Sequence, residues 1–212
     1  MKKRIIRIAS LALVILGMVS CSDEQETALR PQDAKSIPMT FLVSHPGQAS
    51  RATETNFEKN DKIGLYVADA KAQLEIGGNL VNNEALTYDG SKWTAARALY
   101  WDKGTYTAYA YYPYIENVSS ITDQSFSVAL DQRVAKTATS LGGYEASDLL
   151  FATSKNISAS ASPINLTFKH IMSKLKIRLV KGEDFEGEMP ATADVYIHNT
   201  VPTATVDLQA GV

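Results

Sequence analysis

The sequence around Cys21 indicates its chemistry more clearly than that of any other residue. Cys21 is the only cysteine in the 212 residues. It has no partner for an internal disulfide, so its thiol is expected to serve another purpose. A basic start, Met1 to Arg4 with Arg7, precedes an apolar or small run from Ile8 to Val19. This pattern is typical of a secretory signal. The run would reach roughly 18 Å as a helix, which is short of a bilayer core of about 30 Å.

The end of this signal, Met18-Val19-Ser20-Cys21, resembles a lipobox, although Met18 stands where Leu is usual. In a lipobox the thiol is thioether-linked to diacylglycerol and the cysteine becomes the N-terminus. Each buried methylene of the acyl chains, such as palmitate, contributes about 0.8 kcal/mol, and two or more chains anchor a protein firmly. We therefore predict that residues 1–21 are a lipoprotein signal peptide and that lipidated Cys21 holds the chain to the outer membrane.

The acidic stretch from Ser22 to Glu26 has two interpretations. It is either a solvated spacer or similar to the surface-export tag of lipoproteins from the Bacteroides group. The rest of residues 22–50 is polar and contains Pro31, Pro38 and Pro46, which favours a tether. It includes a possible removable strand at 39–44.

No residue pattern indicates catalysis, so we expect no catalytic residues, no cofactor and no bound metal. The histidines, His45, His170 and His198, lack the spacing of metal ligands. No glycine loop suited to phosphate is present, and Ser, His and Asp residues alone predict no triad. Four of the 21 basic residues would leave with the signal, so 17 basic and 23 acidic residues would remain, a net charge of −6. An acidic chain of this kind argues against a nucleic-acid partner.

The elements that would have to position any site are strands. Short apolar or alternating runs recur between turn signals, and no long helical period is present. Residues 51–212 are expected to form one all-β domain, a sandwich or barrel, which at this size can be stable without disulfides. The segment 133–149 is the least regular and has room for a helical turn. Strands are expected at 63–67, 92–94, 98–101, 105–112, 125–130, 149–153, 164–170, 175–180, 193–198 and 204–208.

One local irregularity is expected near Ser173. Leu166, Phe168, His170 and Met172 would share a strand face, whereas Leu175 falls out of that phase by one residue. Because a slip of one residue turns every side chain to the other face, a bulge or a break must intervene.

Several short motifs, none specific alone, together resemble the fimbrillin family of Bacteroides-type bacteria, the subunits and accessory proteins of type V pili. Their order and spacing carry the resemblance, which covers about residues 39 to 208. The motifs are Phe57 to Tyr66, Leu99-Tyr100-Trp101, Tyr109 to Tyr114, Asp131-Gln132, Ser147 to Ala152, and Phe168 to Leu175.

The resemblance implies a transthyretin-like or Greek-key β-sandwich of about seven or more strands, with little helix. It also implies a lipoprotein precursor that an arginine-specific protease trims at the cell surface. The candidate cleavage site is Arg51, because Pro31 follows the other candidate, Arg30. Trimming would remove the strand Met39 to Val43, and a neighbouring subunit would fill the opened groove by β-augmentation. The implied function is a surface-exposed fimbrial subunit that contributes to adhesion, in the fimbrium or on the outer membrane.

Structural roles are the expectation for the motif residues. Asp61 is expected to close an Asx-type turn before a strand. Trp101 and the tyrosines are expected to fill the core with their hydroxyls near water. Ser147-Asp148 would satisfy local backbone donors, and His170 would be a hydrogen-bonded core histidine.

Two alternatives remain open. A surface-anchored module would bind carbohydrate or host protein through exposed rings such as Trp93 or Tyr114. A pilus anchor subunit would keep the lipid on Cys21. Family members usually carry a second β domain, which is expected to be absent or truncated here because the chain ends at Gly211-Val212.

Overall fold

The computed structural model divides into two units, Met1–Gln32 and Asp33–Val212, and describes residues 37–47 and 56–212 of the second. The described residues form strands and a single turn of 3-10 helix, η2, with no α-helix, which confirms the all-β prediction. The elements are β1 (Phe41–Ser44), β2 (Lys62–Asp69), β3 (Val81–Tyr88), β4 (Trp93–Ala95), β5 (Thr105–Tyr112), β6 (Gln124–Ser127), η2 (Glu145–Ser147), β7 (Leu150–Ser158), β8 (Ile164–Thr167), β9 (Lys169–His170) and β10 (Thr203–Val206).

The central feature is a six-stranded antiparallel sheet in the order β4-β3-β2-β5-β7-β9. Strand β2 lies in its middle, and its residues from Ile63 to Ala68 are buried on both faces of the sheet. Ile63, Leu65 and Val67 point into one hydrophobic cluster, while Tyr66 and Ala68 point into another. Because successive side chains alternate across a strand, one continuous apolar run supplies both clusters.

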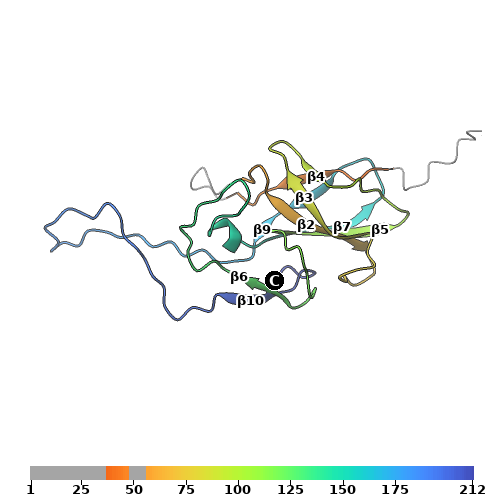
Figure 1. The fold of residues 1–212 in the computed structure, drawn as a ribbon. Coiled ribbons are helices and arrows are strands. Elements are labelled where there is room, and N and C mark those ends of the chain that lie inside the picture. Colours follow the sequence, from red (N-terminus) through yellow and green to blue (C-terminus); the bar gives the residue numbers. More distant parts are fainter. Residues whose placement is uncertain (1–36, 48–55) are drawn as a thin grey trace, which may run out of the picture. The chain divides into compact units, whose positions relative to one another are not determined.

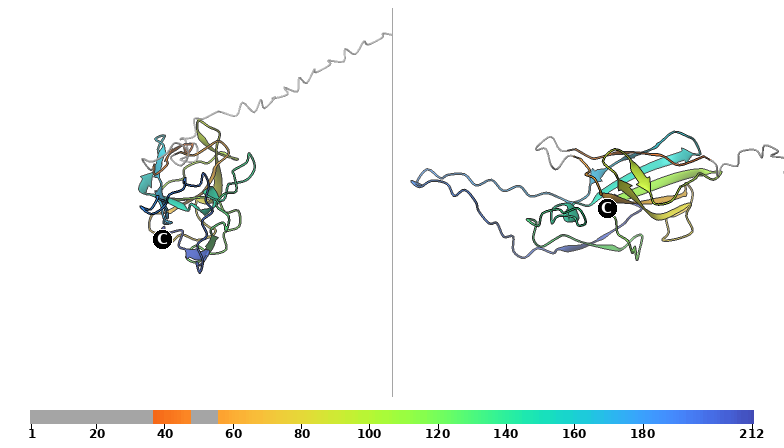
Figure 2. Two further views of the ribbon diagram at one scale, coloured as in Figure 1. Left: turned by 90° about the vertical axis from the view of Figure 1, so that its left-hand side faces the viewer. Right: turned by 45° about the horizontal axis from the view of Figure 1, so that its top comes forward.

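Each face of this sheet is covered by a separate strand pair. The parallel pair β1-β8 places Ile164 and Leu166 in the first cluster, and Met39, just before β1, joins them there. The antiparallel pair β6-β10 places Phe126 and Val206 in the second, and Figures 1 and 2 show these two strands lying side by side. Sheets packed face to face over hydrophobic clusters, as here, form a β-sandwich.

Gly64 is required by the way β2 and β5 meet. It stands opposite Tyr111 in the ladder, and a Cβ at this position would lie 2.3 Å from the tyrosine ring. The ring occupies that space because its hydroxyl donates to Asn83 Oδ1 at 2.6 Å. Tyr66, on the same face, has a buried hydroxyl with no partner among the described residues, and burial raises its pKa to about 12. The expectation that the tyrosine hydroxyls stay near water is therefore wrong for Tyr66.

The sequence patterns located most of the strands. The predicted strands at 63–67 and 105–112 correspond to β2 and β5, and the predicted helical turn within 133–149 corresponds to η2. The segment 98–101 is not a regular strand, and it contributes only a bridge between Pro38 and Tyr100. Strand β3 was not predicted, because its sequence carries few apolar residues in a row.

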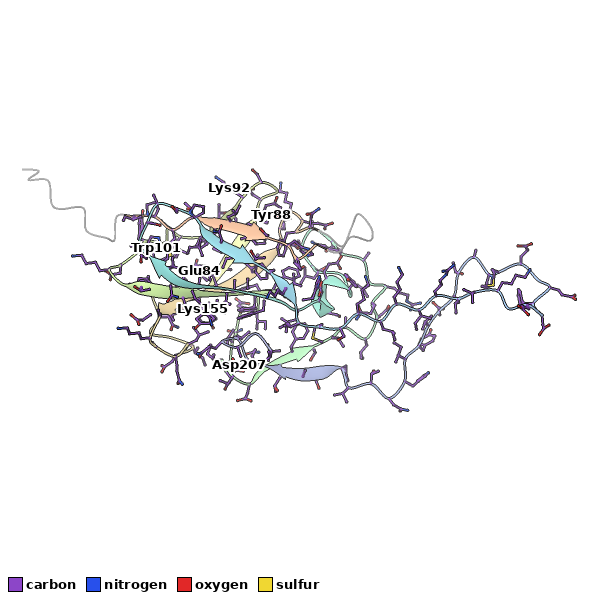
Figure 3. All side chains as sticks on the ribbon, turned by 180° about the vertical axis from the view of Figure 1, so that it is seen from behind. Glu84, Tyr88, Lys92, Trp101, Lys155 and Asp207 are labelled. Carbon is purple, nitrogen blue, oxygen red and sulfur yellow. The ribbon has the colours of Figure 1, made fainter. Side chains whose placement is uncertain are left out.

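The predicted irregularity near Ser173 is confirmed, and its extent is larger than expected. The strand breaks at Phe168 between β8 and β9, and pairing ends after His170. We call residues 173–201 the exposed return, because every residue in this range is exposed. It contains no strand, so the predictions of strands at 175–180 and 193–198 are wrong. Alternating apolar and polar residues give a segment one apolar face. To form a strand, the segment also needs a neighbouring strand for its backbone hydrogen bonds and a surface for its apolar face to cover. Figure 3 shows the side chains of the exposed return standing clear of the sheets.

Within the described part of the chain, no helix is both long enough and apolar enough to cross a membrane. In the same residues, His, Cys, Asp and Glu side chains do not gather in groups of three or more that are suited to a metal ion.

Candidate functional site

The first strand lies in a bed formed by two separate backbone segments. On one side β8 runs parallel to β1, from Phe41 opposite Ile164 to Ser44 opposite Thr167. The Ile164 N–H donates to Thr40 O at 2.8 Å, and the Phe168 N–H donates to Ser44 O at 3.0 Å. We call the facing edges of β8 and of residues 99–101 the β1 bed.

On the other side of the bed, residues 99–101 pair with residues 37–39, which precede β1. The Met39 N–H donates to Leu99 O at 2.8 Å, and the Trp101 N–H donates to Ile37 O at 2.9 Å. Residues 37–44 thus complete the hydrogen bonding of two segments that, among the described residues, are not paired with each other. If residues 37–44 left, both segments would lose the partners of their backbone groups.

Side-chain alternation seats β1 in the bed. Met39 is buried, Phe41 and Val43 pack against the same cluster, and Leu42 between them is 56% exposed. The cluster beneath them includes Trp101 and Leu166, both fully buried. The core position predicted for Trp101 is therefore confirmed, although its ring nitrogen has no hydrogen-bond partner among the described residues. The bed combines backbone pairing with an apolar floor, the two elements that a strand-binding groove needs.

A ring cluster lies directly beyond the end of β1. The His45 ring meets Phe57 edge to face with centroids 4.9 Å apart, and meets His170 with centroids 5.9 Å apart. His170 Nδ1 lies 2.8 Å from Asp148 Oδ1, so His170 is hydrogen-bonded, as predicted. It is half-buried, however, and not the core residue that was expected. Sequence spacing gave no sign that His45 and His170 meet, because the residues are far apart along the chain.

A charged cluster sits below these rings, where β2 begins. Asp61 is buried and accepts the Glu58 N–H at 2.7 Å, so it closes the turn before β2, though across three residues rather than as an Asx turn. Lys136 Nζ lies 2.6 Å from Asp61 Oδ1 and 3.1 Å from Glu58 Oε2. Burial alone would lower the pKa of Lys136, but its hydrogen bonds to Asp61 and Glu58 outweigh that effect and raise it. Lys136 therefore remains a cation that neutralises a buried carboxylate.

Residues of both the ring cluster and the charged cluster line a small cavity of about 30 Å³. Tyr112 lines it from β5, and its hydroxyl pKa is raised by burial and then by the carboxylates of Asp61, Glu145 and Asp148. The neutral hydroxyl thus stays a hydrogen-bond donor at ordinary pH.

The other predicted residues fall into three groups. Cys21 and Arg51 lie outside the described residues, so their roles remain predictions. Ser147 satisfies a backbone donor, but not the local one predicted, because its hydroxyl accepts the N–H of Ala129, 18 residues away, at 2.8 Å. Its local partner is an acceptor, Gly143 O, to which the hydroxyl donates at 2.6 Å. Trp93 is buried and stacks on Tyr88 with centroids 5.2 Å apart, so the expectation that it is an exposed binding ring is wrong.

Comparison with known proteins places this fold in context. A sequence model described as fimbrillin-like matches residues 50–212. A Bacteroides ovatus protein designated as a fimbrium tip subunit, Fim1C, is 30% identical over 129 residues, which are 57% of this chain and 23% of that protein. The chain therefore spans about a quarter of the length of that curated relative.

Solved structures give matches at lower identity. A fimbrial protein from Bacteroides ovatus aligns with a TM-score of 0.39 and 23% identity, covering 63% of this chain and 28% of that one. The fimbrial anchor protein Mfa2 from Porphyromonas gingivalis aligns with a TM-score of 0.30 and 16% identity, covering 63% of this chain and 50% of that one.

Proposed function

The chain belongs to the fimbrillin-like family, and from that premise we propose that it is a surface-exposed fimbrial subunit that assembles by strand exchange at the β1 bed. The family is one of fimbrial structural proteins, which act at the cell surface or in the fimbrium and associate with other fimbrial subunits. Strand exchange, lipoprotein export and a contribution to adhesion are the parts that we add.

The observation that carries the proposal is the double-sided pairing of residues 37–44. These residues bond to β8 through Thr40 O and Ser44 O, and to the opposite edge through the Met39 N–H and Ile37 O. A foreign strand of the same pattern, with apolar side chains where Met39 and Val43 now lie, would restore the hydrogen bonds and refill the floor. Backbone bonds would supply the affinity and alternate side chains the register.

Removal of β1 requires a cut between it and β2, and Arg51 is our candidate. It lies in residues 48–55, which connect Gly47 to Asn56. Small and polar residues surround Arg51 in the sequence, which suits a proteolytic site. Upstream, we propose that residues 1–21 are the signal peptide, that Cys21 carries the lipid during export, and that residues 22–50 are the tether that trimming removes. Because the cut would fall after Arg51, residues 52–212 would be left as the working domain.

A lipid-retaining anchor subunit is the second candidate role. It would keep both β1 and the lipid on Cys21 and would end the pilus rather than extend it. A carbohydrate- or protein-binding module is less favoured than either fimbrial role, because Trp93 is buried and Tyr114 is only partly exposed.

A disulfide staple tests strand exchange directly. Leu42 and Asn165 are register partners on the outward face of the β1-β8 pair, so Leu42→Cys with Asn165→Cys would tie β1 to its bed without disturbing the core. The matched control staple joins Thr87→Cys to Thr94→Cys, partners in β3 and β4. We expect the control chain, but not the β1-stapled chain, to enter high-mass surface assemblies in its own cells. Equal incorporation of both would refute exchange at this bed.

A further inference from the structure

We propose that His45 is a pH-sensitive latch, which holds the end of β1 in its bed while the imidazole is neutral and loosens it once the imidazole is protonated. The biological meaning of the latch rests on the proposed strand exchange. The latch itself is a property of the intact chain and is open to test without any cleavage or partner.

The geometry of His45 selects the neutral ring. The Gly47 N–H donates to His45 Nδ1 at 3.2 Å, and an imidazole nitrogen accepts a hydrogen bond only when it carries no proton. Protonation of Nδ1 would turn this acceptor into a donor that faces another donor. The hydrogen bond that fixes the chain beyond β1 would then be lost.

The surroundings of His45 offer a cation little compensation. The edge-to-face contact with Phe57 buries one side of the ring, and the His170 ring of β9 lies on another. The nearby carboxylates already have partners, since Asp148 is held by His170, and Asp61 and Glu58 are held by Lys136. The remaining titratable groups of the adjoining cavity are Glu145 of η2 and the hydroxyls of Tyr112 and Tyr144.

The sign of the effect follows from these contacts. Burial lowers the pKa of His45 below 6.5, the nearby His170 lowers it further, and Asp148 and Asp61 offset only part of this. An undocked His45 would titrate near its ordinary value of about 6.5. Docking of β1 is therefore strongest above that pH, and it weakens as the pH falls through about 6.5 toward the lower pKa of the docked state. Each unit of pKa difference weakens docking by up to about tenfold.

Hydrogen exchange of the intact chain measures this docking at single amides. The Phe168 amide donates to Ser44 O, next to His45, whereas the Trp101 amide donates to Ile37 O at the opposite end of the segment. Between about pH 7.5 and pH 5 we expect the protection factor of the Phe168 amide to fall about three- to tenfold. The protection factor of the Ile164 amide should fall less, and that of the Trp101 amide should fall least. The protection factors of amides in the β2-β5 ladder should not change.

Two variants assign the effect to the latch. His45→Gln keeps an acceptor for the Gly47 N–H, and His45→Phe keeps a ring against Phe57, yet neither residue titrates. The pH dependence at Phe168 should vanish in whichever of the two retains β1 docking at neutral pH. The control His198→Gln, in the exposed return, should behave as the unaltered chain does.

The latch would be overturned if the protection factor of the Phe168 amide did not depend on pH. It would also be overturned if that protection factor still fell with pH in the His45 variants. An equal fall in the protection factors of the β2-β5 ladder would overturn it as well. None of these results depends on whether β1 is ever exchanged. A failure of the disulfide-staple experiment would conversely leave the latch intact, so the two proposals fail separately.

Discussion

The rings of His45 and Phe57 meet edge to face, with 4.9 Å between their centroids and an interplanar angle of 79°. His45 follows β1 and Phe57 precedes β2, so this contact brings together the two described ends of the segment 48–55. Arg51 lies between those ends in the sequence. The contact thus joins the strand that we propose to be exchanged to the domain that would remain after cleavage.

Cleavage after Arg51 is open to a direct mutational test. Arg51→Ala removes the side chain that an arginine-specific protease would recognise, so the surface form of the chain should keep residues 22–50. Arg30→Ala is the matched control and should leave trimming unchanged, because Pro31 follows Arg30. N-terminal sequencing of the surface protein checks both variants. Recovery of trimmed chain from Arg51→Ala would rule out this site.

The close approach of β2 and β5 predicts a large effect at Gly64. Gly64→Ala would place a Cβ 2.3 Å from the Tyr111 ring, and we expect a loss of about 1–3 kcal/mol in the free energy of unfolding. A Cβ at Gly77 would meet no atom within 4 Å, so Gly77→Ala should change stability by less than about 0.5 kcal/mol. Urea unfolding measures the difference. Equal effects at both positions would contradict the described ladder.

Breaking the Lys136–Asp61 ion pair beneath the ring cluster should cost more stability than breaking the exposed pair of Arg97 with Glu84. Lys136→Met would leave the buried Asp61 carboxylate without its cation, at a cost of about 1–3 kcal/mol, less than for a fully buried pair because Lys136 is 17% exposed. Arg97→Met removes a pair with Glu84 whose arginine is 62% exposed, and it should cost less than about 1 kcal/mol. Thermal unfolding at low ionic strength compares them. A larger loss from Arg97→Met would contradict this assignment.

Two leucines distinguish the core from the exposed return. Leu166 is fully buried beneath β1, so Leu166→Ala should cost about 2–5 kcal/mol. Leu179 is 55% exposed, and Leu179→Ala should stay within about 0.5 kcal/mol. The comparison uses the same chemical change at both sites, measured by denaturant unfolding. A comparable loss at Leu179 would mean that the return packs against a surface in solution.

These positions also explain what the sequence could predict. The apolar runs of β2 and β5 were recognisable because each is buried on both faces and needs a hydrophobic side chain at nearly every position. Strand β3 escaped prediction because its identity comes from its neighbours. Its polar sequence is held between β2 and β4 by backbone pairing, which any residue other than proline supplies.

The site was predictable in part for the same reason. The β character of residues 39–44 is local, so a strand could be expected there, and β1 spans Phe41–Ser44. The β1 bed is formed by residues that are distant in sequence from β1. The contact of His45 with His170 likewise joins distant residues. No local sequence pattern could therefore indicate the bed or this contact. The strand predicted at 175–180 fails for the converse reason, since its alternation is local but its pairing partner is not present among the described residues.

The intact mass of the mature protein, taken from the surface of the cells that make it, tests the central claim most directly. Exchange at the β1 bed predicts a chain that begins at Ala52, without lipid and without β1. A chain that begins at Cys21, carries the mass of a diacylglycerol group and retains residues 22–51 would contradict it, because β1 would still occupy its own bed.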